Sequence, residues 1–252
     1  ISNMIHPLSG ENEIKDFLNN SNSRYIIVID IALEKIDNIV NNTKIKNIIS
    51  VSVDNSMPNP LKIAYRTMNA YKTAVNIYKA FNSKNSDLVI RWNDFIKLGR
   101  RYTKEIEDNF SEKEIATILY SGGTSGAPKG VELTNLNVNA LAMQSFEAVA
   151  NLREKDKVLA IMPIFHGFGL GVCIHTVQYF GGTSILLPQF SAKTFDKLIK
   201  KYEPNVLVGV PTLYEALLNN RKIKNMDLSF VKCAISGGDS LSINLKNKIE
   251  KV

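Results

Sequence analysis

The sequence predicts an α/β fold with mostly parallel sheets and helices on both faces, and three observations support this. Short apolar runs of strand length alternate with longer segments of helical periodicity. The strand-like runs, such as Tyr25–Ile29, are continuously apolar, which is typical of strands covered on both faces. Glycine-rich segments directly follow two of these runs, at the position where open α/β sheets bind ligands. This alternation indicates crossover helices between parallel strands.

The first part of the chain contains two strand-like runs with one helix between them. We expect strands at residues 25–29 and 47–53, because both are rich in isoleucine and valine. The intervening residues 32–41 have helical periodicity. Residues 54–60 contain two prolines and are predicted to form a loop.

A basic, amphipathic segment follows at residues 61–81. Its apolar side chains recur at helical spacing while lysine and arginine occupy other positions. The apolar positions are Leu61, Tyr65, Met68, Val75 and Tyr78. Two interpretations remain open: the helix rests on a membrane and meets acyl substrates there, or it is an ordinary surface helix that packs on the sheet.

Downstream, strands and helices alternate regularly. The expected strands are 115–119, 158–161, 183–187, 206–210 and 231–235, and the expected helices are 136–150, 169–180, 192–202, 213–220 and 243–252. We therefore divide the chain into an upstream α/β portion, residues 1–110, and a portion with the glycine-rich segments, residues 111–252.

Composition excludes several classes of protein. Hydrophobic residues make up 44% of the chain and charged residues 22%, so a buried core is expected and global disorder is not. The net charge of +7 comes from scattered lysines rather than a basic run, which argues against nucleic-acid binding. Residues 158–192 carry no charged side chain, but glycine, proline and histidine interrupt them too often for a membrane span.

The cysteines and histidines show no metal-binding pattern. Cys173 and Cys233 lie far apart in apolar surroundings, and neither has a partner at metal-ligand spacing. No two of the three histidines form a metal pair, so no protein metal site is expected. Buried free thiols indicate a reducing compartment, and we expect a cytoplasmic protein, with peripheral contact at the inner membrane face as an open possibility.

The most informative segment is residues 120–131, which contains four glycines, three hydroxyl side chains in addition to Tyr120, and Lys129. Glycine allows several backbone N–H groups to point at one anion, hydroxyls add donors, and a lysine supplies a positive charge. The segment therefore predicts a cradle for a polyphosphate. Lys129 follows Pro128 and precedes Gly130, so the nucleotide P-loop pattern does not apply.

Residues 121–131 resemble the phosphate loop of adenylate-forming enzymes, the superfamily of acyl-CoA synthetases, adenylation domains and luciferases. Residues 162–170 resemble the family's Pro-x-Phe-His-x-Phe-Gly segment beside the acyl pocket, and residues 234–241 resemble its adenine-packing Ser-Gly-Gly segment. Residues 210–214 resemble a further family segment. The resemblance implies part of the large N-terminal domain of these enzymes, with the small C-terminal domain absent from this chain.

The resemblance also implies roles for individual residues. The expected phosphate-binding residues are Ser121, Gly122, Gly123, Thr124, Ser125, Gly126 and Lys129, and the expected adenine-site residues are Gly237, Gly238 and Asp239. Phe165, His166 and Phe168 are expected at the acyl substrate. Lys129, Thr124 and His166 are the expected catalytic residues, with His166 positioning the carboxylate rather than transferring a proton; a satisfied core histidine is the alternative.

The implied reaction activates a carboxylic acid with ATP and Mg²⁺ to acyl-AMP and pyrophosphate, then transfers the acyl group to coenzyme A. The motifs are most similar to bacterial long-chain fatty acid–CoA ligases. One alternative is an amino-acid or fatty-acyl adenylation enzyme that loads a carrier protein, and another is a nucleotide-binding module without catalysis. The chain lacks the C-terminal segments of the family, so alone we expect it to be inactive. Asn135 departs from the family, which often has histidine there.

Overall fold

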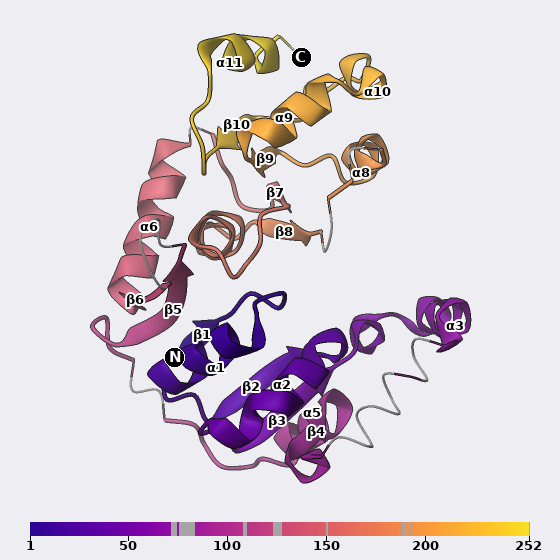
Figure 1. The fold of residues 1–252 in the computed structure, drawn as a ribbon. Helices are drawn as coiled ribbons and strands as arrows, with labels where there is room; N and C mark the ends of the chain where they lie inside the picture. Colours follow the sequence, from indigo (N-terminus) through magenta and orange to yellow (C-terminus); the bar gives the residue numbers. More distant parts are fainter. Residues whose placement is uncertain are drawn as a thin grey trace. The chain divides into compact units, whose positions relative to one another are not determined.

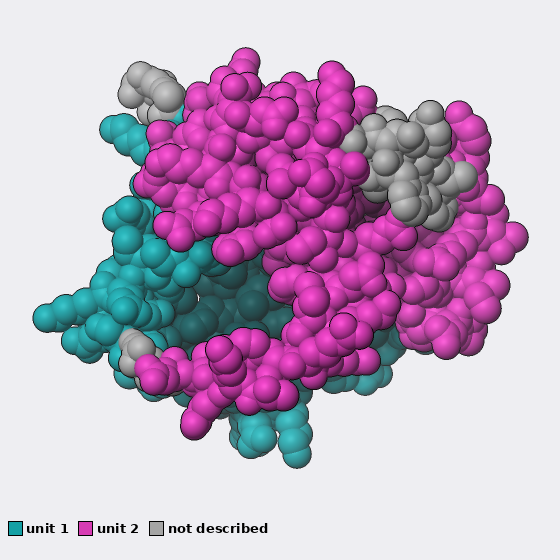
Figure 2. Space-filling model, turned by 90° about the horizontal axis from the view of Figure 1, so that it is seen from below, with its two compact units in different colours: residues 1–4, 110–252 teal, residues 5–109 magenta. Residues whose placement is uncertain are grey.

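The computed structural model (Figure 1) describes residues 1–71, 75, 84–107, 110–122, 128–149, 151–187, 190–191 and 193–251. The chain forms two compact units, which Figure 2 shows in separate colours. One unit consists of residues 5–109, and the other combines residues 1–4 with residues 110–252.

The unit of residues 5–109 is built on a three-stranded parallel sheet in the order β2-β3-β4. Its elements are α1 (Glu11–Asn20), β2 (Tyr25–Ile29), η1 (Asp30–Ala32), α2 (Leu33–Ile39), η2 (Val40–Asn42), β3 (Asn47–Val51), η3 (Val53–Ser56), α3 (Asn59–Met68), η4 (Ser86–Leu88), β4 (Val89–Arg91) and α5 (Trp92–Arg100). Side chains of α1 and α2, such as Leu18 and Ile36, form a core with Val28 and Ile48 of the sheet. The predicted strands at 25–29 and 47–53 and the helix at 32–41 correspond to β2, β3 and α2 with its short 3-10 extensions.

The region around α3 differs from the prediction. Residues 54–60 are not a loop, because the 3-10 helix η3 occupies Val53–Ser56 and α3 begins at Asn59. Pro60 lies in the first turn of α3, where a proline is tolerated because the first N–H groups of a helix have no partner within it. No residue of α3 is buried, so the expected packing of this helix on the sheet is not found between residues 59 and 68. Tyr78 and most of the predicted helix beyond residue 71 lie outside the described residues.

The other unit contains two sheets. Their elements are β1 (Ser2–Met4), β5 (Ile115–Ser121), β6 (Lys129–Thr134), α6 (Asn135–Ala148), β7 (Lys157–Ala160), the π-helix η5 (Phe168–His175), α7 (Thr176–Tyr179), β8 (Thr183–Leu186), α8 (Phe195–Tyr202), β9 (Val206–Gly209), α9 (Pro211–Leu218), α10 (Arg221–Lys224), β10 (Cys233–Ser236) and α11 (Ile243–Ile249). The strand orders are β1-β5-β6 and β10-β9-β7-β8. All pairs are parallel except β5 with β6.

Both faces of the four-stranded sheet are covered, as its continuously apolar strands predicted. Alternate residues of a strand point to opposite faces. On one face Leu159 and Leu207 pack against α8 and α9, and on the other Val158 and Val206 pack against η5 and α7. The segments that follow the carboxyl ends of these strands are therefore attached to a sheet that is buried on both faces.

Two features of this unit were not predicted. β6 is an antiparallel partner of β5, although its first three residues, 129–131, were assigned to the phosphate loop and no strand was expected there. The predicted helix at 169–180 is a π-helix over Phe168–His175 and continues as the short α7. Within the described part of the chain, no helix combines the length and apolar character needed to cross a bilayer.

Candidate active site

The β5–β6 hairpin fixes both ends of the predicted phosphate loop. Its register places Ser121, the last residue of β5, opposite Lys129, the first residue of β6. The Ser121 hydroxyl lies 3.5 Å from the Lys129 carbonyl oxygen and donates to it. Ser121, Gly122 and Lys129 are all exposed, so the base of the loop presents a hydroxyl and an ammonium group to solvent. Gly123, Thr124, Ser125 and Gly126 lie outside the described residues.

A tight turn precedes the π-helix and carries His166. The His166 N–H donates to the Pro163 carbonyl at 3.1 Å, and the Phe168 N–H donates to His166 Nδ1 at 3.4 Å. A neutral ring that accepts at Nδ1 carries its proton on Nε2. The side chain of His166 is exposed, so the alternative of a satisfied core histidine is wrong, whereas Phe165 and Phe168 are half-buried.

Gly169 allows this turn to lie against the start of the π-helix. A Cβ atom at Gly169 would lie 2.1 Å from the Pro163 carbonyl oxygen and 2.7 Å from that of Met162. Real Cβ atoms do not approach so closely, so only glycine fits here without a backbone shift. The glycine thus sets where Phe168 and His166 lie.

The predicted adenine-site glycines directly follow β10. Gly237 extends the parallel pairing, since its N–H donates to the Gly209 carbonyl at 3.1 Å. Gly238 has a φ of +81°, a left-handed conformation that favours glycine. A Cβ atom at Gly237 would lie 3.0 Å from the Phe168 ring, and one at Gly238 would lie 3.3 Å from Val210.

These contacts bring together segments that are far apart in the sequence. Phe168 lies against Gly237, and a Cβ atom at Gly167 would lie 3.5 Å from Leu119 on β5, two residues before Ser121. The start of the phosphate loop, the predicted acyl segment and the predicted adenine segment therefore meet in one place. Asp239 is exposed, and its carboxylate accepts the Ser240 N–H at 2.7 Å, so that interaction is local.

Tyr214 of α9 ties together the strands beneath this site. Its buried hydroxyl lies 3.0 Å from the Leu207 carbonyl oxygen on β9 and 2.8 Å from the Ile235 carbonyl oxygen on β10. Burial raises the pKa of the Tyr214 phenol well above its ordinary value of 10. The group therefore stays a neutral donor. The sequence had marked residues 210–214 only by resemblance, and the structure shows a structural role for this tyrosine.

The start of α6 accounts for the departure at Asn135. The Thr134 hydroxyl caps the helix by accepting the Asn137 N–H at 3.2 Å, and Asn137 Oδ1 accepts the Thr134 N–H in return. The side-chain amide Nδ2 of Asn135 donates to the Ser111 carbonyl oxygen at 2.8 Å. Asn135 thus joins the helix that follows β6 to the segment that precedes β5, outside the phosphate loop itself.

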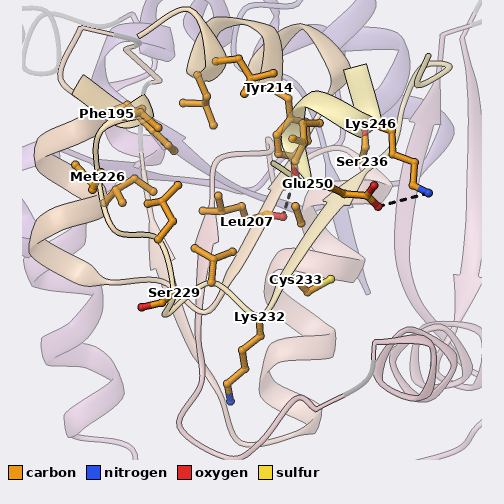
Figure 3. Close-up of a pocket in the computed structure, with 18 of the residues that line it drawn as sticks. Phe195, Leu207, Tyr214, Met226, Ser229, Lys232, Cys233, Ser236, Lys246 and Glu250 are labelled. Atoms are coloured by element: carbon orange, nitrogen blue, oxygen red, sulfur yellow. Dashed lines mark hydrogen bonds and ion pairs between the residues drawn. The ribbon is translucent and has the colours of Figure 1, made fainter. Parts of the chain in front are cut away.

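A cavity of about 860 Å³ lies between the β9–β10 face and helices α8 to α11 (Figure 3). Its lining is mainly apolar and includes Phe195, Leu207 and Met226, with Ser236 at the end of β10. Figure 3 shows Lys232 pointing away from it, which agrees with the ion pair of Lys232 with Asp156 at 2.8 Å. Among the described residues, Gly237, Gly238, Asp239 and the predicted phosphate and acyl residues do not line this cavity, whereas Ala234, Ser236 and Leu241 of the predicted adenine segment do.

The described residues offer donors for phosphate but no dedicated metal cage. In the ranges that the structure describes, no group of three or more His, Cys, Asp or Glu side chains is placed to hold a metal ion. A hydroxyl and a lysine at the base of a glycine-rich loop fit a polyphosphate. Mg²⁺ usually binds through substrate phosphates and water with only one or two carboxylates, so this donor set is compatible with a magnesium–nucleotide complex.

Comparison with known proteins identifies the family. The sequence profile of the AMP-binding enzyme family matches residues 1–252. The long-chain-fatty-acid–CoA ligase of Bacillus subtilis is 31% identical over 98% of this chain and 43% of its own length, and that of Haemophilus influenzae is 27% identical over 93% and 42%. The chain thus spans less than half the length of these relatives.

Solved structures agree on the fold. A crystal structure of an anthranilate CoA ligase with anthranoyl-AMP has a TM-score of 0.78 at 22% identity, over 100% of this chain and 43% of that one. A long-chain-fatty-acid–CoA ligase from Archaeoglobus fulgidus has a TM-score of 0.73 at 21% identity, over 99% and 43%. The predicted α/β fold of the N-terminal domain of adenylate-forming enzymes is confirmed, and the chain belongs to the AMP-binding enzyme family.

Proposed function

We propose that the protein carrying this chain is an ATP-dependent, AMP-forming acid–thiol ligase that acts on a long-chain fatty acid and coenzyme A. The observation that supports this most directly is the meeting of three segments, through the contacts of Leu119 with Gly167 and of Phe168 with Gly237. The two relatives described above are named for the same activity.

The proposed reaction has two steps. A carboxylate oxygen of the fatty acid attacks the α-phosphorus of ATP, the bond from that phosphorus to the bridging oxygen breaks, and pyrophosphate leaves. The thiol sulfur of coenzyme A then attacks the acyl carbonyl carbon, its proton passes to solvent, and AMP leaves. Positioning and charge neutralisation are the main tasks of a protein in such transfers.

In this proposal the hairpin base and the loop above it hold the β- and γ-phosphates. Ser121 donates a hydrogen bond, and Lys129 supplies positive charge to the departing pyrophosphate. Gly122, Gly123, Thr124, Ser125 and Gly126 contribute N–H and hydroxyl donors. Mg²⁺ neutralises phosphate charge when bound.

The other two segments would place the nucleotide base and the acid. The absence of side chains at Gly237 and Gly238 would let adenine stack on the backbone that follows β10, beside the Phe168 ring that lies against Gly237. Phe165 and Phe168 would form apolar walls for the acyl chain. The exposed His166 would orient the carboxylate, with its Nδ1 already engaged by the Phe168 N–H.

Carboxylate-dependent exchange of pyrophosphate into ATP tests the first step. With the full-length protein, fatty acids should support exchange and amino acids should not. Lys129→Ala should slow exchange roughly 100-fold because one preorganised charge at the phosphates is lost. Lys200→Ala is the matched control, since Lys200 is an exposed lysine on α8 of the same unit.

The outcomes separate the alternatives. Exchange with amino acids alone would replace this proposal with an adenylation enzyme, and acyl transfer to a carrier protein but not to coenzyme A would change the acceptor. If the protein binds nucleotide but supports no exchange of pyrophosphate into ATP, it would be a nucleotide-binding module without catalysis. The 252-residue chain measured alongside should show no exchange, and activity from it alone would contradict a need for further sequence.

A further inference from the structure

Helix η5, which carries Phe168 at its start, is a π-helix of 8 residues. π-helices usually occur as single turns within α-helices and often lie at functional sites. In a π-helix each backbone N–H donates to the carbonyl five residues earlier, one residue further than in an α-helix. We call this wider spacing the π register. The hydrogen bonds that select it determine where the two ends of η5 lie relative to each other.

Thr176, the residue that follows η5, selects the π register with its side chain. Its hydroxyl donates to the Gly171 carbonyl oxygen at 2.9 Å, and its backbone N–H donates to the same oxygen. In an α-helix a threonine hydroxyl bonds to the carbonyl three or four residues earlier, so a bond across five residues is specific to the π register. Thr176 is 3% exposed, which shields this bond from competing water.

Ser184 attaches the same helix to the sheet. Its hydroxyl, on β8, donates to the Cys173 carbonyl oxygen in the middle of η5 at 2.7 Å. Cys173 is fully buried, and its thiol is hydrogen-bonded to the backbone of Met162, which directly precedes the turn that carries His166. The middle of η5 is therefore fixed both to strand β8 and to this turn.

The start of η5 reaches the candidate site through Phe168. The Phe168 ring lies against Gly237, where a Cβ atom would be 3.0 Å from it. The Leu170 N–H donates to the His166 carbonyl at 2.9 Å, so the turn with His166 continues directly into the helix. A change from the π register to α-helical spacing would shift the start of η5 by one residue relative to α7, which is about 1.5 Å along the axis and about 100° around it. Such a shift would withdraw Phe168 from Gly237 and displace His166.

We propose that Thr176 and Ser184 are positioning residues, which hold η5 in the π register and thereby fix Phe168 and His166 for formation of the acyl-adenylate. Both hydroxyls are engaged by carbonyl oxygens of η5, so each acts through this helix rather than on the substrate. The proposal rests on the ligase function proposed above. It concerns the acid and adenine end of the site, since the phosphate end is held by the β5–β6 hairpin.

Thr176→Val and Ser184→Ala, each made in the full-length protein, remove one hydroxyl with little change of shape. A displacement of about 1 Å can cost on the order of 100-fold in rate, so kcat for fatty-acid-dependent exchange of pyrophosphate into ATP should fall roughly 10- to 100-fold. The KM for the fatty acid should rise as well, because His166 no longer orients the carboxylate. The KM for pyrophosphate should change by less than about twofold, because pyrophosphate binds at the hairpin.

Two further variants serve as controls. Thr176→Ser keeps the hydroxyl and should retain most of the wild-type exchange. Ser21→Ala is the matched control for Ser184→Ala, because the Ser21 hydroxyl also donates to a helix carbonyl oxygen, that of Phe17, at 2.7 Å. This bond belongs to the unit of residues 5–109, so its loss should leave exchange of pyrophosphate unchanged.

Several results would overturn the proposal. A fall in kcat with both KM values unchanged would indicate a smaller folded fraction rather than a displaced site. Wild-type kinetics in Thr176→Val, or equal losses in Thr176→Val and Thr176→Ser, would exclude a role for the hydroxyl. If Thr176→Val does not fold, Ser184→Ala carries the same test.

Hydrogen exchange, followed by mass spectrometry on the ligand-free protein, gives a second readout that does not need ligase activity. The amides of residues 170–176 should exchange faster in Thr176→Val than in Thr176→Ser, because the π register is held less firmly. Equal exchange in the two variants would refute the hold on η5. If the wild type catalysed no exchange of pyrophosphate but the amides behaved as expected, the ligase function would be wrong and the hold on η5 would stand.

Discussion

Replacing Gly169 with alanine tests the packing at the centre of the candidate site. The new Cβ atom would lie 2.1 Å from the Pro163 carbonyl oxygen and 2.6 Å from the Pro163 carbonyl carbon. Unstrained contacts of this kind need about 3.5 Å, so the turn and the π-helix must separate by more than about 1 Å. Since the obstructing atoms belong to the backbone, no side-chain rotation relieves the contact.

The expected loss of stability is near the upper end of overpacking effects, about 3 kcal/mol. That is a large fraction of the 5–15 kcal/mol that typically separates folded from unfolded domains. Urea unfolding followed by far-ultraviolet circular dichroism measures it, together with pyrophosphate exchange, which should fall because Phe168 and His166 are displaced. Ligand-free unfolding separates the stability effect from any effect on binding.

Gly99→Ala is the matched control for this substitution. Gly99 lies in α5, where a Cβ atom would meet no atom within 4 Å, so alanine should stabilise that helix by about 0.5 kcal/mol. Trp92 at the start of α5 provides a fluorescence signal for this unit. A loss below about 1 kcal/mol for Gly169→Ala would refute the argument that the close approach requires glycine.

Three further predictions follow from buried polar groups. Tyr214→Phe removes the hydroxyl that bridges β9 and β10 and should lower the free energy of unfolding by about 1 kcal/mol in urea titrations; no change would exclude a net contribution from these bonds. Burial raises the pKa of the Cys173 thiol to about 11, so at pH 8 this thiol should react with thiol reagents only after the protein unfolds. Rapid labelling of Cys173 in the folded protein, measured in a Cys233→Ala background, would contradict its burial. Burial alone would raise the pKa of Asp54, but hydrogen bonds and the Arg66 and Lys62 charges lower this pKa below 3.8. The ionised carboxylate therefore stabilises the fold above pH 3.8, and this stabilisation is lost as the pH falls below that value. Asp54→Asn should accordingly make the free energy of unfolding less dependent on pH in this acid range. An unchanged acid profile in Asp54→Asn would refute that linkage.

The elements predicted correctly are those whose apolar composition indicates that they are buried. β7 and β9 are short apolar runs, and both were expected because a strand covered on both faces needs no polar alternation. α3 was misplaced because Pro58 and Pro60 suggested a loop, although proline is compatible with a first helical turn. β6 was missed because Lys129 and Gly130 were assigned to the phosphate loop, and a hairpin partner is set by pairing rather than by its own composition.

The sequence could nominate the segments of the candidate site, but not the contacts that join them. Glycine and hydroxyl content marked the phosphate loop, and resemblance marked the segments around His166 and Gly237. The contact of Phe168 with Gly237 depends on where the π-helix begins, and apolar periodicity does not distinguish a π-helix from an α-helix. Likewise, the bond from Asn135 to Ser111 joins residues that no local pattern relates.

The pairing of β1 with β5 has a consequence for how the chain folds. The Ser2 hydroxyl donates to the Ala116 carbonyl across 114 residues of sequence, so the unit of residues 5–109 is an insertion between two strands of the other unit. Contacts between residues so distant in sequence form slowly, because a long loop must close first. During synthesis the inserted unit can fold before β5 has left the ribosome, whereas residues 1–4 can form β1 pairing only after β5 is available. Deleting those four residues should therefore leave early folding unchanged and slow or prevent the completion of the β1-β5-β6 sheet.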